Sequence, residues 1–184
     1  MNKDEKGQVV EMMVSGLAID PSTRNPIILL QDSSGRRQVP ISIDHIQSHN
    51  ILKRIEGIPS EEASVHDITA AIIQESNLKL INIVIHLTKE NGFFGVLKLA
   101  KQTSKKINEQ NAIELKVKVI DAIALAITVN CQIWVHEEVI AYASIPINKE
   151  ADRFEQDEFR GFLNRIDATT FIKHLKNDER DYIN

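Results

Sequence analysis

The stretch "KVKVIDAIALAITVNCQIWVHEEV" (Lys116–Val139) decides the fold class. Its first residues alternate between polar and apolar side chains, which is the pattern of a strand with one buried face. A short apolar run follows from Asp121 and predicts a buried helix, and "QIWV" predicts a second strand. A strand, a helix and a strand in succession indicate an α+β domain.

Strands dominate the sequence before this stretch. The segment "LKLINIVIHLTKENGFFGVLKLA" (78–100) predicts two strands joined by the turn "KENG". "QVVEMMVSGLAID" predicts a buried strand, and "IILLQD" with "RQVPISI" predicts a hairpin. We therefore expect a mostly antiparallel mixed sheet with packed helices. Its strongest strand should direct one set of side chains into the core, namely Ile81, Ile83, Ile85 and Leu87.

Helix boundaries are marked by capping residues. Asp44 can cap a helix over "HIQSHNILKRIE", which Gly57 would end in the left-handed conformation that glycine tolerates. Ser64 with Asp67 forms a capping-box pattern before "VHDITAAIIQES". The polar segment "KQTSKKINEQN" (101–111) predicts a loop, and "IELKVKV" after it predicts a strand with Ile113 facing inward.

The chain divides into a domain over residues 1–148 and a linker with a helical C-terminal tail over 149–184. One internal similarity is visible between "ISIDHI" (Ile41–Ile46) and "VKVIDAI" (Val117–Ile123). It is either a chance match or the trace of a duplicated β-β-β-α unit. In the second case Asp44 and Asp121 would hold equivalent places.

Composition limits the possible functions. The 22 basic and 26 acidic residues give a formal charge of −4, which argues against holding nucleic acid by bulk charge but leaves a local basic patch open. No apolar run reaches the roughly 20 residues of a membrane span. The N-terminus "MNKDEKGQ" is too polar for a signal peptide. We expect a cytoplasmic protein without membrane contact, in which the single cysteine, Cys131, is an inert thiol.

Few familiar catalytic motifs are present. The sequence has no GxGxxG, P-loop or GxSxG motif, and "HEEVI" lacks the second histidine of a zinc helix. What remains is a set of carboxylates at predicted element ends, Asp44, Glu56, Asp67 and Asp121, with His66 beside Asp67. Each can be a helix-capping or first-turn acid worth about 1 kcal/mol, or a ligand of Mg²⁺.

Several ordered pieces of the sequence extend this interpretation. They are "VSGLAIDPSTRNPIILLQDSSGRRQVPISI", "ILKRIEG", "VHDI", "NGFFGVLKL", "DAIALAI" and "IWVHEEV". Together they resemble the bifunctional nuclease (BFN) domain family of bacteria and plants, which is associated with RNase and DNase activity. The resemblance covers roughly Val9 to Pro146.

The chain is a divergent member by this resemblance. Where the family usually reads D-A-R-P-S-D-A-I-A-L-A, this sequence reads "KVKVIDAIALA". The first acid is replaced by Lys116 and the arginine by Lys118, which keeps the charge but not the bidentate fork. Asp121 and the His66-Asp67 pair keep the family pattern.

The resemblance implies a nuclease that hydrolyses RNA or DNA phosphodiesters, with weak or lost activity. Asp67 and Asp121 would hold Mg²⁺ or another divalent cation, Lys118 would contact the phosphate and His66 would carry a proton, so that His66, Asp67 and Asp121 form the catalytic set. The alternative is a non-catalytic binding or assembly protein on the same scaffold.

A homo-oligomer, most simply a dimer, is also expected. Phe93, Phe94 and Trp134 are large apolar side chains near predicted strand ends or turns, and exposed apolar patches usually mark interfaces. The family resemblance also implies a homo-oligomer, without fixing its stoichiometry.

Overall fold

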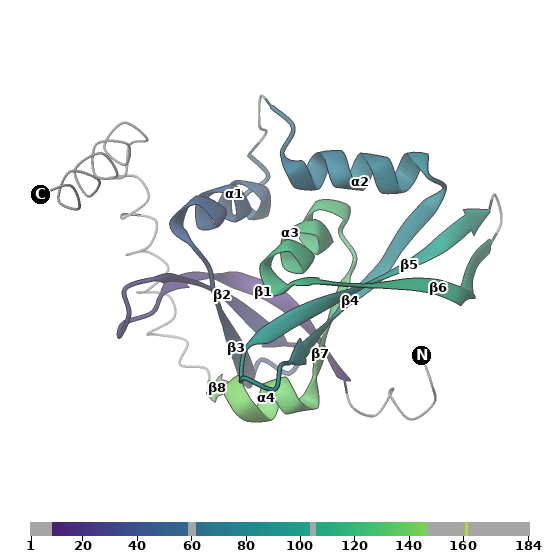
Figure 1. Ribbon diagram of the computed structural model, residues 1–184. Helices are drawn as coiled ribbons and strands as arrows, with labels where there is room; N and C mark the ends of the chain where they lie inside the picture. Colours follow the sequence, from purple (N-terminus) through teal and green to yellow (C-terminus); the bar gives the residue numbers. More distant parts are fainter. Residues whose placement is uncertain (1–8, 59–61, 104–105, 147–160, 162–184) are drawn as a thin grey trace, which may run out of the picture.

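The computed structural model of the protein describes residues 9–58, 62–103, 106–146 and 161. Within these residues, eight strands form one mixed sheet in the order β6-β5-β4-β7-β1-β2-β3-β8, and four helices pack against it (Figure 1). The α+β class and the mostly antiparallel mixed sheet are therefore confirmed. The elements are β1 (Val9–Ile19), β2 (Pro26–Asp32), β3 (Arg37–Ser42), α1 (His45–Ile55), α2 (Val65–Glu75), β4 (Leu78–Leu87), β5 (Phe93–Thr103), β6 (Lys106–Lys118), α3 (Val119–Val129), β7 (Gln132–His136), α4 (Glu137–Ala143) and β8 (Ile145–Pro146).

Seven of the eight strands form two antiparallel three-stranded units joined by β7, and β8 pairs with β3 at the edge of the sheet. β1, β2 and β3 precede α1, while β4, β5 and β6 precede α3, so the β-β-β-α order occurs twice as the internal similarity suggested. β7 lies between the units, antiparallel to β1 and parallel to β4. The helices α1, α2 and α3 lie on the same side of the sheet (Figure 1).

The side chains of β4 change faces at a bulge. Its pairing with β5 shifts between Leu80 and Asn82, and an extra residue in one strand reverses the alternation beyond it. Ile83 and Ile85 are fully buried as predicted, but Leu80 takes the inward position that was expected for Ile81, which is half-buried. The fourth expected core residue, Leu87, is partly buried against the core.

The hairpin formed by β5 and β6 is longer than expected. The predicted loop over 101–111 is wrong, because β5 continues to Thr103 and β6 begins at Lys106, and the two residues pair with each other. β6 is an edge strand of the sheet, so its inward side chains have little to cover them. Ile113, expected in the core, is consequently 44% exposed.

Helix α3 lies very close to β5 because Gly95 has no side chain. A Cβ added at Gly95 would come within 2.4 Å of the Cβ of Ala122. Six residues of α3 are buried: Ile120, Ala122, Ile123, Ala124, Leu125 and Ala126. The small residues of "DAIALAI" and the glycine of "NGFFGVLKL" therefore permit one close helix–sheet contact.

The predicted helix signals at α1 and α2 are confirmed. Asp44 accepts a hydrogen bond from the backbone of Gln47, Ser64 accepts one from Asp67, and both sites are complete capping boxes. Gly57 follows α1 with φ of 66°. No helix in the described ranges is long and apolar enough to cross a membrane. Apart from Gly161, the predicted helical tail lies outside the described residues.

Candidate active site

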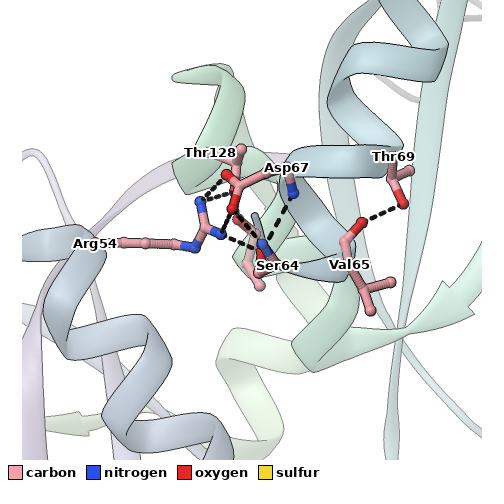
Figure 2. Close-up of polar contacts among 7 residues, drawn as sticks. Arg54, Ser64, Val65, Asp67, Thr69 and Thr128 are labelled. Carbon is pink, nitrogen blue, oxygen red and sulfur yellow. Dashed lines mark hydrogen bonds and ion pairs between the residues drawn. The ribbon is translucent and has the colours of Figure 1, made fainter. Parts of the chain in front are cut away.

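Arg54, from the last turn of α1, joins three elements. Its Nη1 donates to Asp67 Oδ1 at 2.9 Å and its Nη2 to Asp67 Oδ2 at 2.8 Å, which is a bidentate ion pair (Figure 2). Nη1 also donates to Thr128 Oγ1 of α3 at 2.8 Å, and Nη2 donates to Ser64 Oγ. A planar guanidinium satisfies these acceptors together, which the point charge of a lysine cannot do.

Asp67 is held in one position by this arrangement. Besides Arg54, its Oδ2 accepts the backbone N–H of Ser64 at 2.8 Å, which completes the capping box of α2. The hydrogen bonds from Arg54 and then from Ser64 lower the pKa of Asp67 well below its ordinary range. The carboxylate therefore stays ionised near neutral pH and does not exchange protons there.

His66, the neighbour of Asp67 on α2, contacts a different residue. Its Nε2 lies 3.7 Å from Asp121 Oδ1, with the His66 side chain 29% exposed and that of Asp121 49% exposed. Asp121 does not cap α3, because the helix begins two residues earlier at Val119 and its N-cap is Lys118. Asp121 therefore lies in the first turn and, unlike Asp44, accepts no capping hydrogen bond from the helix backbone.

The Arg54–Asp67 ion pair and the His66–Asp121 pair lie beside different turns of α3. Asp67 is linked through Arg54 to Thr128, whereas His66 approaches Asp121. Seven residues separate Asp121 from Thr128, which is roughly 10.5 Å along a helix axis. The structure thus places the predicted residues on one helix–helix surface, but in two adjacent pairs.

The divalent ion implied by the resemblance does not fit these pairs. Both oxygens of Asp67 already accept hydrogen bonds from Arg54, and a cation would have to displace that fork. Over the described ranges, no three or more His, Cys, Asp or Glu side chains are arranged to hold a metal ion. The geometry instead suits proton transfer and contact with an anion.

The lysines that replace family residues point away from this surface. Val117 packs against the core, so alternation along β6 places Lys116 and Lys118 on the sheet face opposite α3. The Nζ of Lys116 lies 3.9 Å from the centre of the Phe94 ring. Lys118 is exposed and directly precedes α3, three residues before Asp121.

An open groove adjoins the Arg54 cluster. It has a volume of about 470 Å³ and lies between the end of α1 and the start of α2. Its lining residues are Asn50, Lys53, Arg54, Ile58, Glu62, Ala63, Ser64 and Asp67. Lys53 and Arg54 line this groove together with the acids Glu62 and Asp67, and Arg54 is already paired with Asp67.

Arg54 and Thr128 were not predicted from the sequence as members of this cluster. Arg54 lies in "ILKRIEG", one of the pieces that carries the family resemblance, and that was the available signal. Cys131 behaves as predicted: burial raises the pKa of its thiol to about 11. It is therefore a poor nucleophile at neutral pH.

Comparison with known proteins completes this description. The sequence model described as the bifunctional nuclease domain matches residues 28–148. Two similar proteins come from Mycobacterium tuberculosis: "Uncharacterized protein MT1877" of strain CDC 1551 / Oshkosh and "Uncharacterized protein Rv1829" of strain ATCC 25618 / H37Rv. Each is 25% identical over 169 residues, which is 88% of this chain and 97% of the relative.

Proposed function

The chain belongs to the bifunctional nuclease domain family, and from this membership we propose that it binds nucleic acid and hydrolyses phosphodiester bonds beside α2 and the first turn of α3. Family membership supports a nuclease-like or nucleic-acid-binding role. The cleavage reaction and its residues are our proposal. A cytoplasmic location and a homo-oligomeric state belong to the same proposal.

The observation that carries this proposal is the His66–Asp121 pair. A carboxylate 3.7 Å from Nε2 favours the tautomer in which Nε2 carries the proton, which leaves Nδ1 free to act as a base. Both side chains are partly exposed, so water and a substrate can reach them. Distances of this kind in a protein without substrate commonly shorten in the reacting complex.

In the proposed reaction, His66 takes a proton from water as the water oxygen attacks phosphorus. The bond between phosphorus and the leaving oxygen breaks, and the imidazolium returns the proton to that oxygen. Asp121 orients the ring and stabilises its charged form. Lys118 has no part in this step, because alternation along β6 turns its side chain toward the sheet face opposite α3. Asp67 positions α2 through Arg54 and transfers no proton.

The same structure favours a second function, which is nucleic-acid binding without cleavage. The observation behind it is the Arg54 clamp, which fully occupies the carboxylate that the resemblance assigns to metal binding. With Asp67 paired to Arg54, the carboxylate is not available to a metal ion. A family member in this state would keep the fold and bind nucleic acid without hydrolysing it.

Cleavage assays distinguish these functions. Labelled single-stranded RNA and DNA are incubated with the purified protein in EDTA and in Mg²⁺ or Mn²⁺, together with His66→Gln and Asp121→Asn. Loss of a general base costs about 10²- to 10⁴-fold in rate, so cleavage should fall by that factor in His66→Gln. His49→Gln, an exposed histidine of α1, is the matched control.

The outcomes separate the alternatives clearly. Cleavage in EDTA that disappears with His66→Gln but not with His49→Gln supports hydrolysis. Equal cleavage by the wild type and all three variants points to a contaminating nuclease and overturns the assignment. Binding without any cleavage supports the second function.

A further inference from the structure

A row of rings and lysines lies on the sheet face opposite α3. Register places Lys118 opposite Phe94 and Phe94 opposite His86, and the ring of His86 contacts that of His136 at the end of β7. The alternate residues of these strands face the core: Ile85 and Val135 are fully buried, and Gly95 contacts α3. Phe94, His86 and His136 therefore belong to the opposite face.

The rings form a continuous stack across three strands. The centres of Phe94 and His86 are 5.2 Å apart with 14° between the ring planes, and those of His86 and His136 are 5.4 Å apart with 30°. The Nζ of Lys116 lies 3.9 Å from the centre of the Phe94 ring at the other end of the stack. All three rings remain partly exposed.

Charge is distributed unevenly over this face. Lys116 and Lys118 are exposed at the Phe94 end. Two acids of this face have basic or amide neighbours: Glu114, two residues before Lys116 on β6, lies opposite Lys98 in register, and Glu11 of β1 accepts a hydrogen bond from Gln132. The outermost ring therefore has two cationic neighbours on β6, Lys116 over its face and Lys118 opposite it in register, although the chain as a whole is acidic.

We infer that this row is a binding platform for single-stranded nucleic acid. A base stacks on Phe94 while Lys116 and Lys118 contact the flanking phosphates. A cation over an exposed ring is held more weakly than a stacked base, so Lys116 can give up the ring face and move to a phosphate. Duplexes hide their base faces, so the platform selects single strands.

The platform extends the proposed function, on which it rests for the identity of the ligand. The backbone of Lys118 connects the two places, because this residue ends the strand that carries the platform and directly precedes the helix turn that carries Asp121. A strand held at Phe94 would thus have a phosphate next to the edge of the proposed active site.

Fluorescence anisotropy with labelled oligo(dT) and oligo(U) of about 12 nucleotides tests the platform, with a hairpin duplex as competitor. Measurements use the wild-type protein in EDTA and, separately, His66→Gln. Phe94→Leu keeps an apolar side chain but removes the ring, and should weaken single-strand binding roughly tenfold. Lys116→Gln should weaken binding and lower the slope of log affinity against log salt by about one.

Tyr142→Leu is the matched control, because Tyr142 is a 54% exposed aromatic on α4. It should leave oligonucleotide affinity unchanged. The inference is overturned by absence of single-strand binding at low salt, by equal affinity for the duplex, or by equal affinities of Phe94→Leu and wild type. It is also overturned if Phe94→Leu changes only self-association, which would assign the face to a second copy of the chain.

These results remain distinct from those for hydrolysis. Binding that depends on Phe94 without any cleavage rejects the reaction but keeps the platform. Cleavage that depends on His66 with binding indifferent to Phe94 rejects the platform and keeps the reaction.

Discussion

Replacing Gly95 with alanine tests the close contact between β5 and α3. The added Cβ would lie 2.4 Å from the Cβ of Ala122, whereas carbon atoms in ordinary contact are about 3.5–4.0 Å apart. The helix must therefore move by about 1 Å or more, and it has little room to do so because Gly95 and Ala122 are both buried. Overpacking of this kind costs about 1–3 kcal/mol of unfolding free energy.

A second substitution separates this clash from other effects. Ala122→Gly alone should cost about 1 kcal/mol through helix propensity. In the double variant the two side chains no longer collide, so its loss should be close to that of Ala122→Gly alone and clearly smaller than the sum of the single losses. Gly92→Ala, whose Cβ would meet only the hydroxyl of Thr88 at 3.3 Å, is the control and should cost less than about 1 kcal/mol.

Urea unfolding followed by far-ultraviolet circular dichroism measures all four variants. Strict additivity of Gly95→Ala and Ala122→Gly, or a Gly95→Ala loss no greater than that of Gly92→Ala, would refute the contact. Since Asp121 precedes Ala122, Gly95→Ala should also shift Asp121 relative to His66 and lower any cleavage that depends on that pair.

Four further predictions follow from the packing and the ion pairs. Ile83→Ala should cost about 2–5 kcal/mol in urea unfolding, and Ile81→Ala distinctly less because the bulge leaves that side chain half-buried; equal losses would contradict the bulge. Arg54→Lys should be nearly as destabilising as Arg54→Met, about 1–2 kcal/mol, because lysine cannot form the fork; full stability of the lysine variant would count against it. Burial alone would raise the pKa of Asp32, but hydrogen bonds from Arg37, Ser34 and two backbone N–H groups lower it to about 2. The ionised Asp32 therefore contributes its full stabilisation above about pH 4, and this stabilisation is lost as the pH falls to about 2. Over that interval the melting temperature of Asp32→Asn should fall less than that of wild type. Sedimentation should show a homo-oligomer, most simply a dimer, and α2 offers an apolar stripe for it in which Val65, Ile68 and Ile72 are 75%, 51% and 59% exposed; a monomer at micromolar concentration would contradict this.

The features that the sequence predicted correctly depend on near neighbours. Asp44 and Ser64 cap their helices through atoms three residues away, and such bonds follow from residue type and spacing. Strand alternation is likewise local, which is why the inward positions of Ile83 and Ile85 were predictable. The half-buried position of Ile81 was not predictable, because the bulge beside it arises from the pairing of β4 with β5.

The candidate site shows the same division. His66 and Asp121 could be proposed from the resemblance, and the structure brings them within 3.7 Å. The pairing of Arg54 with Asp67 depends on how α1 packs beside α2 and α3, and no periodicity in the chain encodes that contact. It matters for the proposed reaction, because both oxygens of Asp67 accept hydrogen bonds from Arg54.

The position of β7 has a consequence for the order of folding during synthesis. Each three-stranded unit is built from consecutive strands and can pair as the chain emerges, but β7 ends only at His136. Until then, the edges of β1 and β4 that receive β7 remain unpaired, and unpaired edges promote association with other chains. Within the described chain the two units are joined through five residues, Gln132–His136. A chain that is truncated shortly before this segment would therefore contain two open half-sheets in place of one continuous sheet.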